Sequence, residues 1–148
     1  SVEGGIGEVG YFKGKNSRGT DINEAKEYAS KSKVDAMAIS VGNTHLQTSK
    51  IAKINYPKIL EIQNITNLPL VLHGSSGISH IMRNKIARRT KVAKFNIGTE
   101  LRMVACKSLR KSYNNNIKNF DKISIMKPSI KELKKETLKV IKNIGPTK

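Results

Sequence analysis

The chain has 148 residues, of which 28 are Lys or Arg and 11 are Asp or Glu, so its formal net charge is +17. A hydrophobic content of 37% is enough for one core, which favours one domain over residues 1–148 and excludes two. The single cysteine excludes a disulfide within the chain, and no apolar run approaches the ~18 residues of a membrane span, so we expect a cytoplasmic protein.

The positive charge raises the question of nucleic-acid binding. The lysines are scattered through every segment, aromatic residues make up only 5% of the chain, and no basic block is interleaved with stacking residues. We therefore interpret the charge as a solvated basic surface and do not expect nucleic acid to be the partner. A basic environment would favour a phosphorylated substrate.

Strand-like and helical patterns alternate along the chain. The glycine-rich residues 1–8 predict a short strand, and Asp21 with Glu24 three positions later is a capping-box pattern that predicts a helix from 22 to about 33. The further elements expected are a strand over 34–41, a helix opening at Tyr56-Pro57, a strand over 68–73, a helix capped by Ser79, a strand over 91–97, a helix over 100–113, and a last helix that begins at Pro128 and ends at Gly145-Pro146.

This alternation predicts an α/β fold with a parallel sheet and helices outside it. The candidate polar residues all follow strand ends, which is where doubly wound sheets and (β/α)8 barrels place their sites. A full barrel needs about 250 residues, so four βα units with a terminal helix would be half of one.

Two histidines, His45 and His73, lie just past the ends of adjacent predicted strands. Neutral imidazoles that converge from neighbouring strands suit Zn²⁺, which takes three protein ligands in catalytic sites and leaves one position open. Two histidines are one ligand short. The alternative interpretation is a pair of loop histidines that make local hydrogen bonds.

Two glycine-containing turns follow consecutive late strands, at residues 74–77 and 96–99. Free amides and the positive end of a helix at such paired turns are a known way for a barrel to hold a phosphate, although a single glycine turn is more often only a tight loop. Lys94 interrupts an apolar strand, where it could be a Schiff-base nucleophile, although such a residue is more often an ion-paired or snorkelling side chain.

The segments that carry these residues resemble the class II, metal-dependent ketose-bisphosphate aldolases, and they are closest to the tagatose- and fructose-bisphosphate branch. The resemblance spans the whole chain in order. Its segments are Val34 to His45, Pro69 to Gly77, Lys94 to Leu101, and Met126-Lys127-Pro128.

The resemblance implies a TIM barrel that cleaves a ketose 1,6-bisphosphate into dihydroxyacetone phosphate and glyceraldehyde 3-phosphate, with Zn²⁺ polarising the ketone and stabilising the enediolate. By match, His45 and His73 are zinc ligands. The residues that would hold the dihydroxyacetone phosphate moiety are Gly74, Ser75, Ser76, Asn96, Ile97, Gly98 and Thr99.

Family members bring the remaining zinc histidine and the acid/base aspartate from the first half of the barrel, which would precede Ser1. We therefore expect the chain to be the C-terminal half of such a barrel, with no catalytic residue of its own and no activity alone. The full-length protein is expected to form a homo-oligomer.

Three departures from the family pattern bear on activity. Leu46 stands where the family usually has a glycine whose amide meets the phosphate, and Gly5 occupies the position of a second acid, leaving Glu3 alone. The acidic mobile loop of the family is short and basic here, at residues 11–16.

The sequence does not distinguish fructose from tagatose bisphosphate as the substrate. It also leaves two alternative functions open. One is an aldolase that uses Lys94 in place of zinc. The other is a non-catalytic basic half-barrel that binds phosphosugar or nucleic acid.

Overall fold

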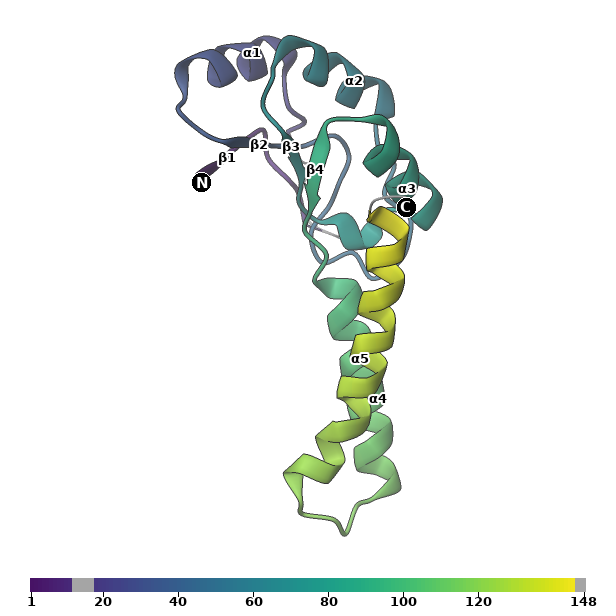
Figure 1. Cartoon of the computed structure of the whole chain (residues 1–148). Helices are drawn as coiled ribbons and strands as arrows, with labels where there is room; N and C mark the ends of the chain where they lie inside the picture. The colour runs from purple at the N-terminus through teal and green to yellow at the C-terminus, as the bar shows by residue number, and fades with distance from the viewer. Residues whose placement is uncertain (12–17, 146–148) are drawn as a thin grey trace. The chain divides into compact units, whose positions relative to one another are not determined.

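The computed structural model describes residues 1–11 and 18–145 (Figure 1). The chain divides into two units, Ser1–Ile97 and Gly98–Lys148. The first holds a sheet with three α-helices, and the second holds two long helices. One partial domain over 1–148 stays a prediction.

Four parallel strands form the sheet of the first unit, in the order β1-β2-β3-β4. Their bounds are β1 Glu3–Ile6, β2 Ala36–Ile39, β3 Leu70–Leu72 and β4 Val92–Phe95. The connections contain α1 Ile22–Lys31, α2 Tyr56–Ile65 and α3 His80–Arg89, and a short 3₁₀ turn at Ser75–Gly77 that was not predicted. Each strand follows its sequence neighbour in space, as in a (β/α) barrel, so the predicted α/β class is confirmed.

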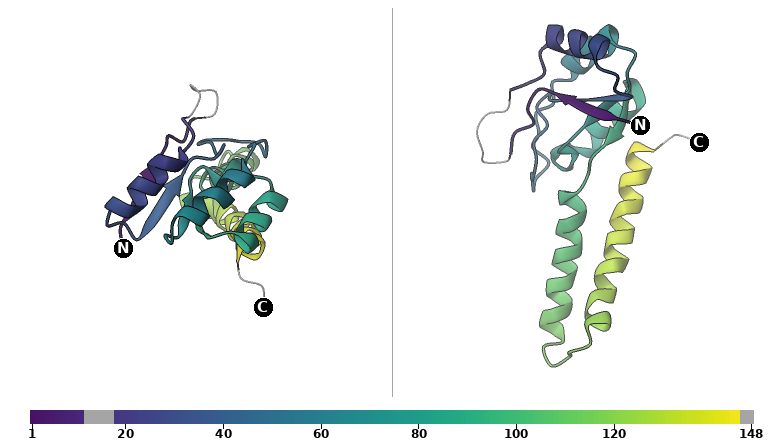
Figure 2. Two further views of the ribbon diagram at one scale, coloured as in Figure 1. Left: turned by 90° about the horizontal axis from the view of Figure 1, so that it is seen from above. Right: turned by 90° about the vertical axis from the view of Figure 1, so that its left-hand side faces the viewer.

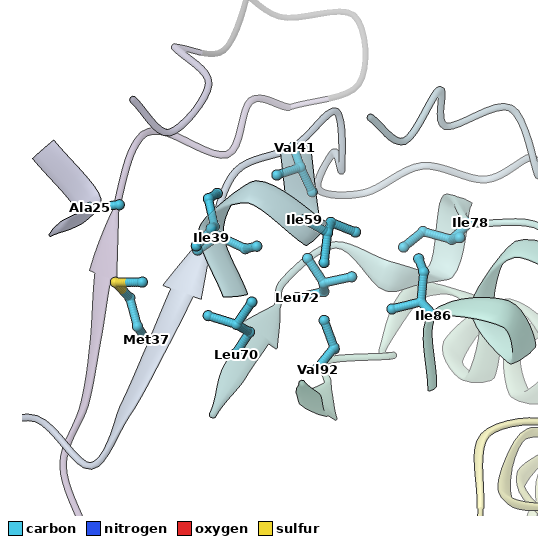
Figure 3. Close-up of a cluster of buried hydrophobic side chains, with 11 residues drawn as sticks. Ala25, Met37, Ile39, Val41, Ile59, Leu70, Leu72, Ile78, Ile86 and Val92 are labelled. Atoms are coloured by element: carbon cyan, nitrogen blue, oxygen red, sulfur yellow. The ribbon is translucent and has the colours of Figure 1, made fainter. Parts of the chain in front are cut away.

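The core lies between the sheet and these helices, as Figure 3 shows. β3 is buried along its whole length, because its run of Leu70-Val71-Leu72 has apolar side chains for both faces of the sheet. Helices α1, α2 and α3 contribute Ala25, Ile59 and Ile86. The other buried residues of the cluster are Met37, Ile39, Val41, Ile62, Leu70, Leu72, Ile78 and Val92.

The helix starts follow the capping signals of the sequence. The Asp21 carboxylate accepts hydrogen bonds from the amides of Asn23 (2.9 Å) and Glu24 (3.0 Å), as predicted. Glu24 itself pairs with Arg18. Ser79 caps α3 through the Met82 amide at 3.2 Å. These local contacts determine the residues at which α1 and α3 begin.

The second unit consists of α4 Thr99–Asn115 and α5 Lys122–Ile144, which pack along each other (Figure 2). The prediction that Pro128 begins the last helix was wrong: α5 begins at Lys122 and contains Pro128. The reason is Asp121, whose carboxylate caps the helix by accepting from the amides of Ile123 and Ser124 at 3.0 and 3.2 Å. α5 changes direction near its start (Figure 1).

Candidate metal and phosphate site

The structure brings together the two histidines that the sequence placed at strand ends. His45 follows β2 and His73 follows β3, and their ring centroids lie 6.0 Å apart in an edge-on arrangement. Both side chains are half-buried. The exposed ring of Tyr11 lies 5.3 Å from the His45 ring, and the His45 amide donates to the Gly10 carbonyl at 2.8 Å. The third histidine, His80, is exposed on α3.

Asn43 joins the two histidine segments from inside the protein. Its side chain is fully buried. Nδ2 donates to the His73 carbonyl at 2.9 Å, while Oδ1 accepts from the Val41 amide at 2.7 Å. No role was predicted for this asparagine. The available signal was its place just after a predicted strand, because a buried side-chain amide there has to find hydrogen-bond partners on the backbone.

Close backbone packing holds the two turns against each other. Gly74 has φ +60°, and a Cβ at this position would lie 2.5 Å from the Thr44 carbonyl oxygen and 3.0 Å from the His45 nitrogen. Only glycine fits both the left-handed conformation and this approach. The turn that follows His73 therefore lies against the turn that carries His45.

The register of the strands decides which side chains share the face of the sheet opposite the helices. The register pairs Gly5 with Ala38, Ala38 with Val71 and Val71 with Lys94, and it shifts between Leu70 and Val71. Because of this shift, β4 has one more residue than β3 between the two neighbouring pairs. Lys94 thus lies on the face of Val71, whereas Val92 packs in the core with Leu70.

Glu3 links this face of the sheet to His73. Its Oε2 lies 2.7 Å from the Lys94 ammonium, and its Oε1 lies 2.8 Å from His73 Nε2. The side-chain nitrogen of Asn96 lies 3.2 Å from the other ring nitrogen of His73, Nδ1, and 3.4 Å from Nε2. Lys94 is therefore ion-paired, which was one of the interpretations of its position. The contacts of Glu3 were not predicted from the sequence.

Electrostatics favour a neutral His45 and an ionised Glu3. Burial, and secondarily the proximity of His73, lowers the pKa of His45 below its usual value. Neutral imidazole is the form that binds metal. The hydrogen bonds from Lys94 and then from His73 lower the pKa of Glu3. The two shifts favour the neutral imidazole of His45 and the ionised carboxylate of Glu3.

The predicted phosphate turns are connected to each other. The Ser75 amide donates to the Asn96 carbonyl at 3.1 Å, and the Ser75 hydroxyl donates to the Leu72 carbonyl at 2.7 Å. Ser75 and Ser76 are buried, while Gly74, Asn96 and Ile97 are half-buried. Ser75 thus uses its own amide and hydroxyl to hold the turn. Binding of a phosphate here stays a prediction.

The remaining predicted residues belong to the second unit or fall outside the described residues. Gly98 and Thr99 stand at the start of the second unit, where Gly98 is the N-cap position of α4. Of the basic loop at 11–16, residues 12–16 lie outside the described residues.

The donor set fits part of a zinc site. Zn–N bonds of about 2.0–2.1 Å place each ring centroid roughly 3 Å from the ion, and a tetrahedral angle then separates two centroids by roughly 5 Å. The 6.0 Å between His45 and His73 is wider than this, so the two rings would have to move closer together to share one ion. Within residues 1–11 and 18–145, no group of three or more His, Cys, Asp or Glu side chains is placed to hold a metal. The chain therefore offers two imidazoles toward such a site.

Parallel strands whose carboxyl ends gather histidine, asparagine and a glycine turn define an α/β protein of the barrel type. A family model described as class-II fructose-bisphosphate aldolase matches residues 1–148. The chain belongs to this family, and the resemblance in its sequence is confirmed.

Solved structures support the fold. The YdjI aldolase from Escherichia coli K12 is 27% identical, with a TM-score of 0.65 over 86% of this chain and 44% of that one. A protein from Coccidioides immitis named as a candidate fructose-1,6-biphosphate aldolase is 18% identical, with a TM-score of 0.77 over 97% and 52% of the two chains. Fructose-bisphosphate aldolase from Campylobacter jejuni is 16% identical, with a TM-score of 0.64 over 85% and 44%. At 18% and 16% identity, the last two bear on the fold alone.

The chain spans about half the length of the solved structures it matches. Its α/β fold accordingly corresponds to half of the aldolase barrel. Among the helices of the described residues, none has the length and apolar content needed to cross a bilayer.

Proposed function

We propose that this chain is the C-terminal half of a zinc-dependent ketose-bisphosphate aldolase, and that His45 and His73 are two of its metal ligands. The observation that carries the proposal is the convergence of these two imidazoles, 6.0 Å apart, at the ends of adjacent strands. Membership of the class II aldolase family supports it.

In this reaction a bound Zn²⁺ supplies Lewis-acid polarisation of the substrate ketone. His45, in its neutral form, and His73 would hold the ion. The turn at Gly74, Ser75 and Ser76, with Asn96, Ile97, Gly98 and Thr99, would hold the phosphate and hydroxyl groups of the dihydroxyacetone phosphate moiety. Ser75, whose amide and hydroxyl are bonded to Asn96 and Leu72, would do so by fixing the shape of the turn. The substrate is fructose or tagatose 1,6-bisphosphate, and the products are dihydroxyacetone phosphate and glyceraldehyde 3-phosphate.

Zinc binding by the chain tests the ligand assignment. We expect His45→Ala and His73→Ala each to weaken Zn²⁺ binding, measured by competition with a chromophoric chelator. His80→Ala is the matched control, because His80 is the exposed histidine of α3 and should not alter the affinity. Equal affinities for all three variants would contradict the assignment.

Aldol cleavage tests the reaction. A longer protein that contains this chain together with the first half of the barrel should cleave ketose bisphosphate, lose the activity to a chelator and regain it with Zn²⁺. The 148-residue chain alone should show no turnover, and chelator-sensitive cleavage by it would overturn the half-site proposal. Trapping of Lys94 by borohydride in the presence of substrate would instead indicate a lysine-based aldolase.

A further inference from the structure

The Glu3 carboxylate connects three strands of the sheet. Glu3 begins the edge strand β1, yet its two oxygens reach Lys94 on β4 and His73 beyond β3, at 2.7 and 2.8 Å. The Glu3 side chain is 26% exposed and that of His73 is 32% exposed, whereas Lys94 is 56% exposed and lies on the solvent side of the pair. A carboxylate with one partner on each oxygen has little freedom to rotate.

These contacts determine which nitrogen of His73 carries the proton. An ionised carboxylate can only accept hydrogen bonds, and the Lys94 ammonium on the second oxygen keeps the Glu3 carboxylate ionised. The hydrogen in the 2.8 Å contact therefore belongs to Nε2 of His73. In the neutral imidazole, the lone pair is then on Nδ1.

The surroundings of Nδ1 agree with this tautomer. The side-chain nitrogen of Asn96 lies 3.2 Å from Nδ1 and 3.4 Å from Nε2, and an amide NH₂ group can only donate, so its nearer contact is compatible with a lone pair on Nδ1. The carboxylate of Glu3 is therefore the contact that distinguishes the two ring nitrogens. A metal that binds His73 must take the Nδ1 lone pair, which Asn96 contacts in this structure.

We propose that Glu3 is a positioning residue for the metal site: it holds the proton of His73 on Nε2, so that His73 presents Nδ1 to the metal. The Lys94 ammonium holds the Glu3 carboxylate in its orientation toward His73. This contact prevents Glu3 from rotating toward the metal and binding it as a competing ligand. Carboxylates that bind the outer nitrogen of a metal-bound histidine orient the ring and raise its basicity. The inference rests on the proposed function, because it concerns the same metal.

The tautomer can be measured without any metal. In the metal-free chain labelled with ¹⁵N at histidine, with the imidazoles neutral, we expect the Nε2–H form to dominate for His73. Glu3→Leu should shift His73 toward a mixture of tautomers. Glu3→Gln should retain the Nε2–H form, because the glutamine carbonyl also accepts a hydrogen bond.

Glu27→Leu is the matched control, because Glu27 lies in the same unit and its carboxylate is also paired with a lysine, Lys31, at 2.6 Å. It should leave the His73 tautomer and the Zn²⁺ affinity unchanged. Glu3→Leu should lower the Zn²⁺ affinity by roughly 10- to 100-fold, the usual effect of losing such a partner.

The two proposals fail in different ways. A wild-type chain that binds no Zn²⁺, with His73 still in the Nε2–H form, would contradict the proposed function and leave the assignment of the proton standing. A wild-type His73 with its proton on Nδ1, or as an even mixture, would overturn the role of Glu3 whether or not zinc binds. This wild-type measurement needs no variant, so it holds even if Glu3→Leu fails to fold.

Discussion

Leu46 carries local strain immediately next to a proposed metal ligand. Among the described residues it is the one residue other than glycine with a positive φ, at +56°, and its side chain is 55% exposed. Its left-handed conformation brings Cβ close to a carbonyl oxygen, at a cost of roughly 1–2 kcal/mol. This is the position where the family usually has glycine, so the departure seen in the sequence has a conformational cost in the structure.

Leu46→Gly should therefore stabilise the chain. We expect the free energy of unfolding in urea to rise by about 1 kcal/mol, since glycine adopts positive φ without strain but loses more chain entropy on folding. Ile51→Gly is the control, because Ile51 is similarly exposed without a positive φ, and it should lower stability. A loss of stability in Leu46→Gly equal to that in the control would contradict this account.

At Gly74, in contrast to Leu46, glycine is the residue that the local backbone conformation requires. Gly74→Ala should destabilise the chain by about 1–3 kcal/mol, because of the left-handed backbone and the 2.5 Å approach of the new Cβ to the Thr44 carbonyl. At Gly5 a Cβ would meet Ala38 only at 3.7 Å, so Gly5→Ala should raise stability by about 0.5–1 kcal/mol. Thermal unfolding of the two variants, followed by circular dichroism, should show melting temperatures that move in opposite directions.

At the scale of the elements, α1 depends on the charge of its N-cap. Hydrogen bonds from the helix amides, above all from that of Glu24, lower the pKa of Asp21. A carboxyl group whose pKa is lowered by folding adds stability above its unfolded pKa, and this stability is lost as pH falls through the folded value. Unfolding of the wild type should therefore become easier in acid.

Asp21→Asn separates this titration from the cap itself. Asparagine accepts the same hydrogen bonds but does not ionise, so the variant should lack this part of the acid dependence. The wild type should be the more stable of the two at neutral pH, and the difference should shrink as pH is lowered. Parallel pH profiles, measured by urea unfolding, would show that the Asp21 charge plays no part.

α5 shows how one capping residue outweighs a proline signal. Proline at a helix start is favourable, which led to the prediction that Pro128 begins the helix. Asp121 and the helix-compatible residues after it extend α5 backward past the proline. The hydrogen bond lost at Pro128 costs less free energy than the helical residues before it contribute. α5 also changes direction near its start (Figure 1).

At the scale of the whole molecule, the charge of +17 is a source of self-repulsion. Salt screens this repulsion, so we expect the free energy of unfolding to rise as NaCl increases from low to physiological ionic strength. Urea unfolding at several salt concentrations measures the effect. A decrease with salt would indicate that favourable ion pairs dominate.

The same charge leads to a test of the non-catalytic alternative. We expect binding to duplex DNA to be weak and to disappear at physiological salt. Binding at low micromolar concentration that persists there, without stoichiometric zinc, would favour a basic half-barrel that binds nucleic acid over an aldolase.

The sequence by itself determined the local structure and the family. Apolar runs, the caps at Asp21 and Ser79, and the proline of α2 act within a few residues, so the order of strands and helices could be predicted. The convergence of His45 and His73 could also be anticipated, because the carboxyl ends of neighbouring parallel strands meet at one edge of a sheet.

Only the tertiary structure decided what surrounds these histidines. Glu3 and His73 are 70 residues apart, and their contact depends on strand order. The side on which Lys94 lies depends on a register shift between β3 and β4. The buried bond from Asn43 to the His73 carbonyl likewise depends on how two turns pack. Long-range contacts of this kind arise from the pairing of distant strands, and no local pattern in the chain encodes them.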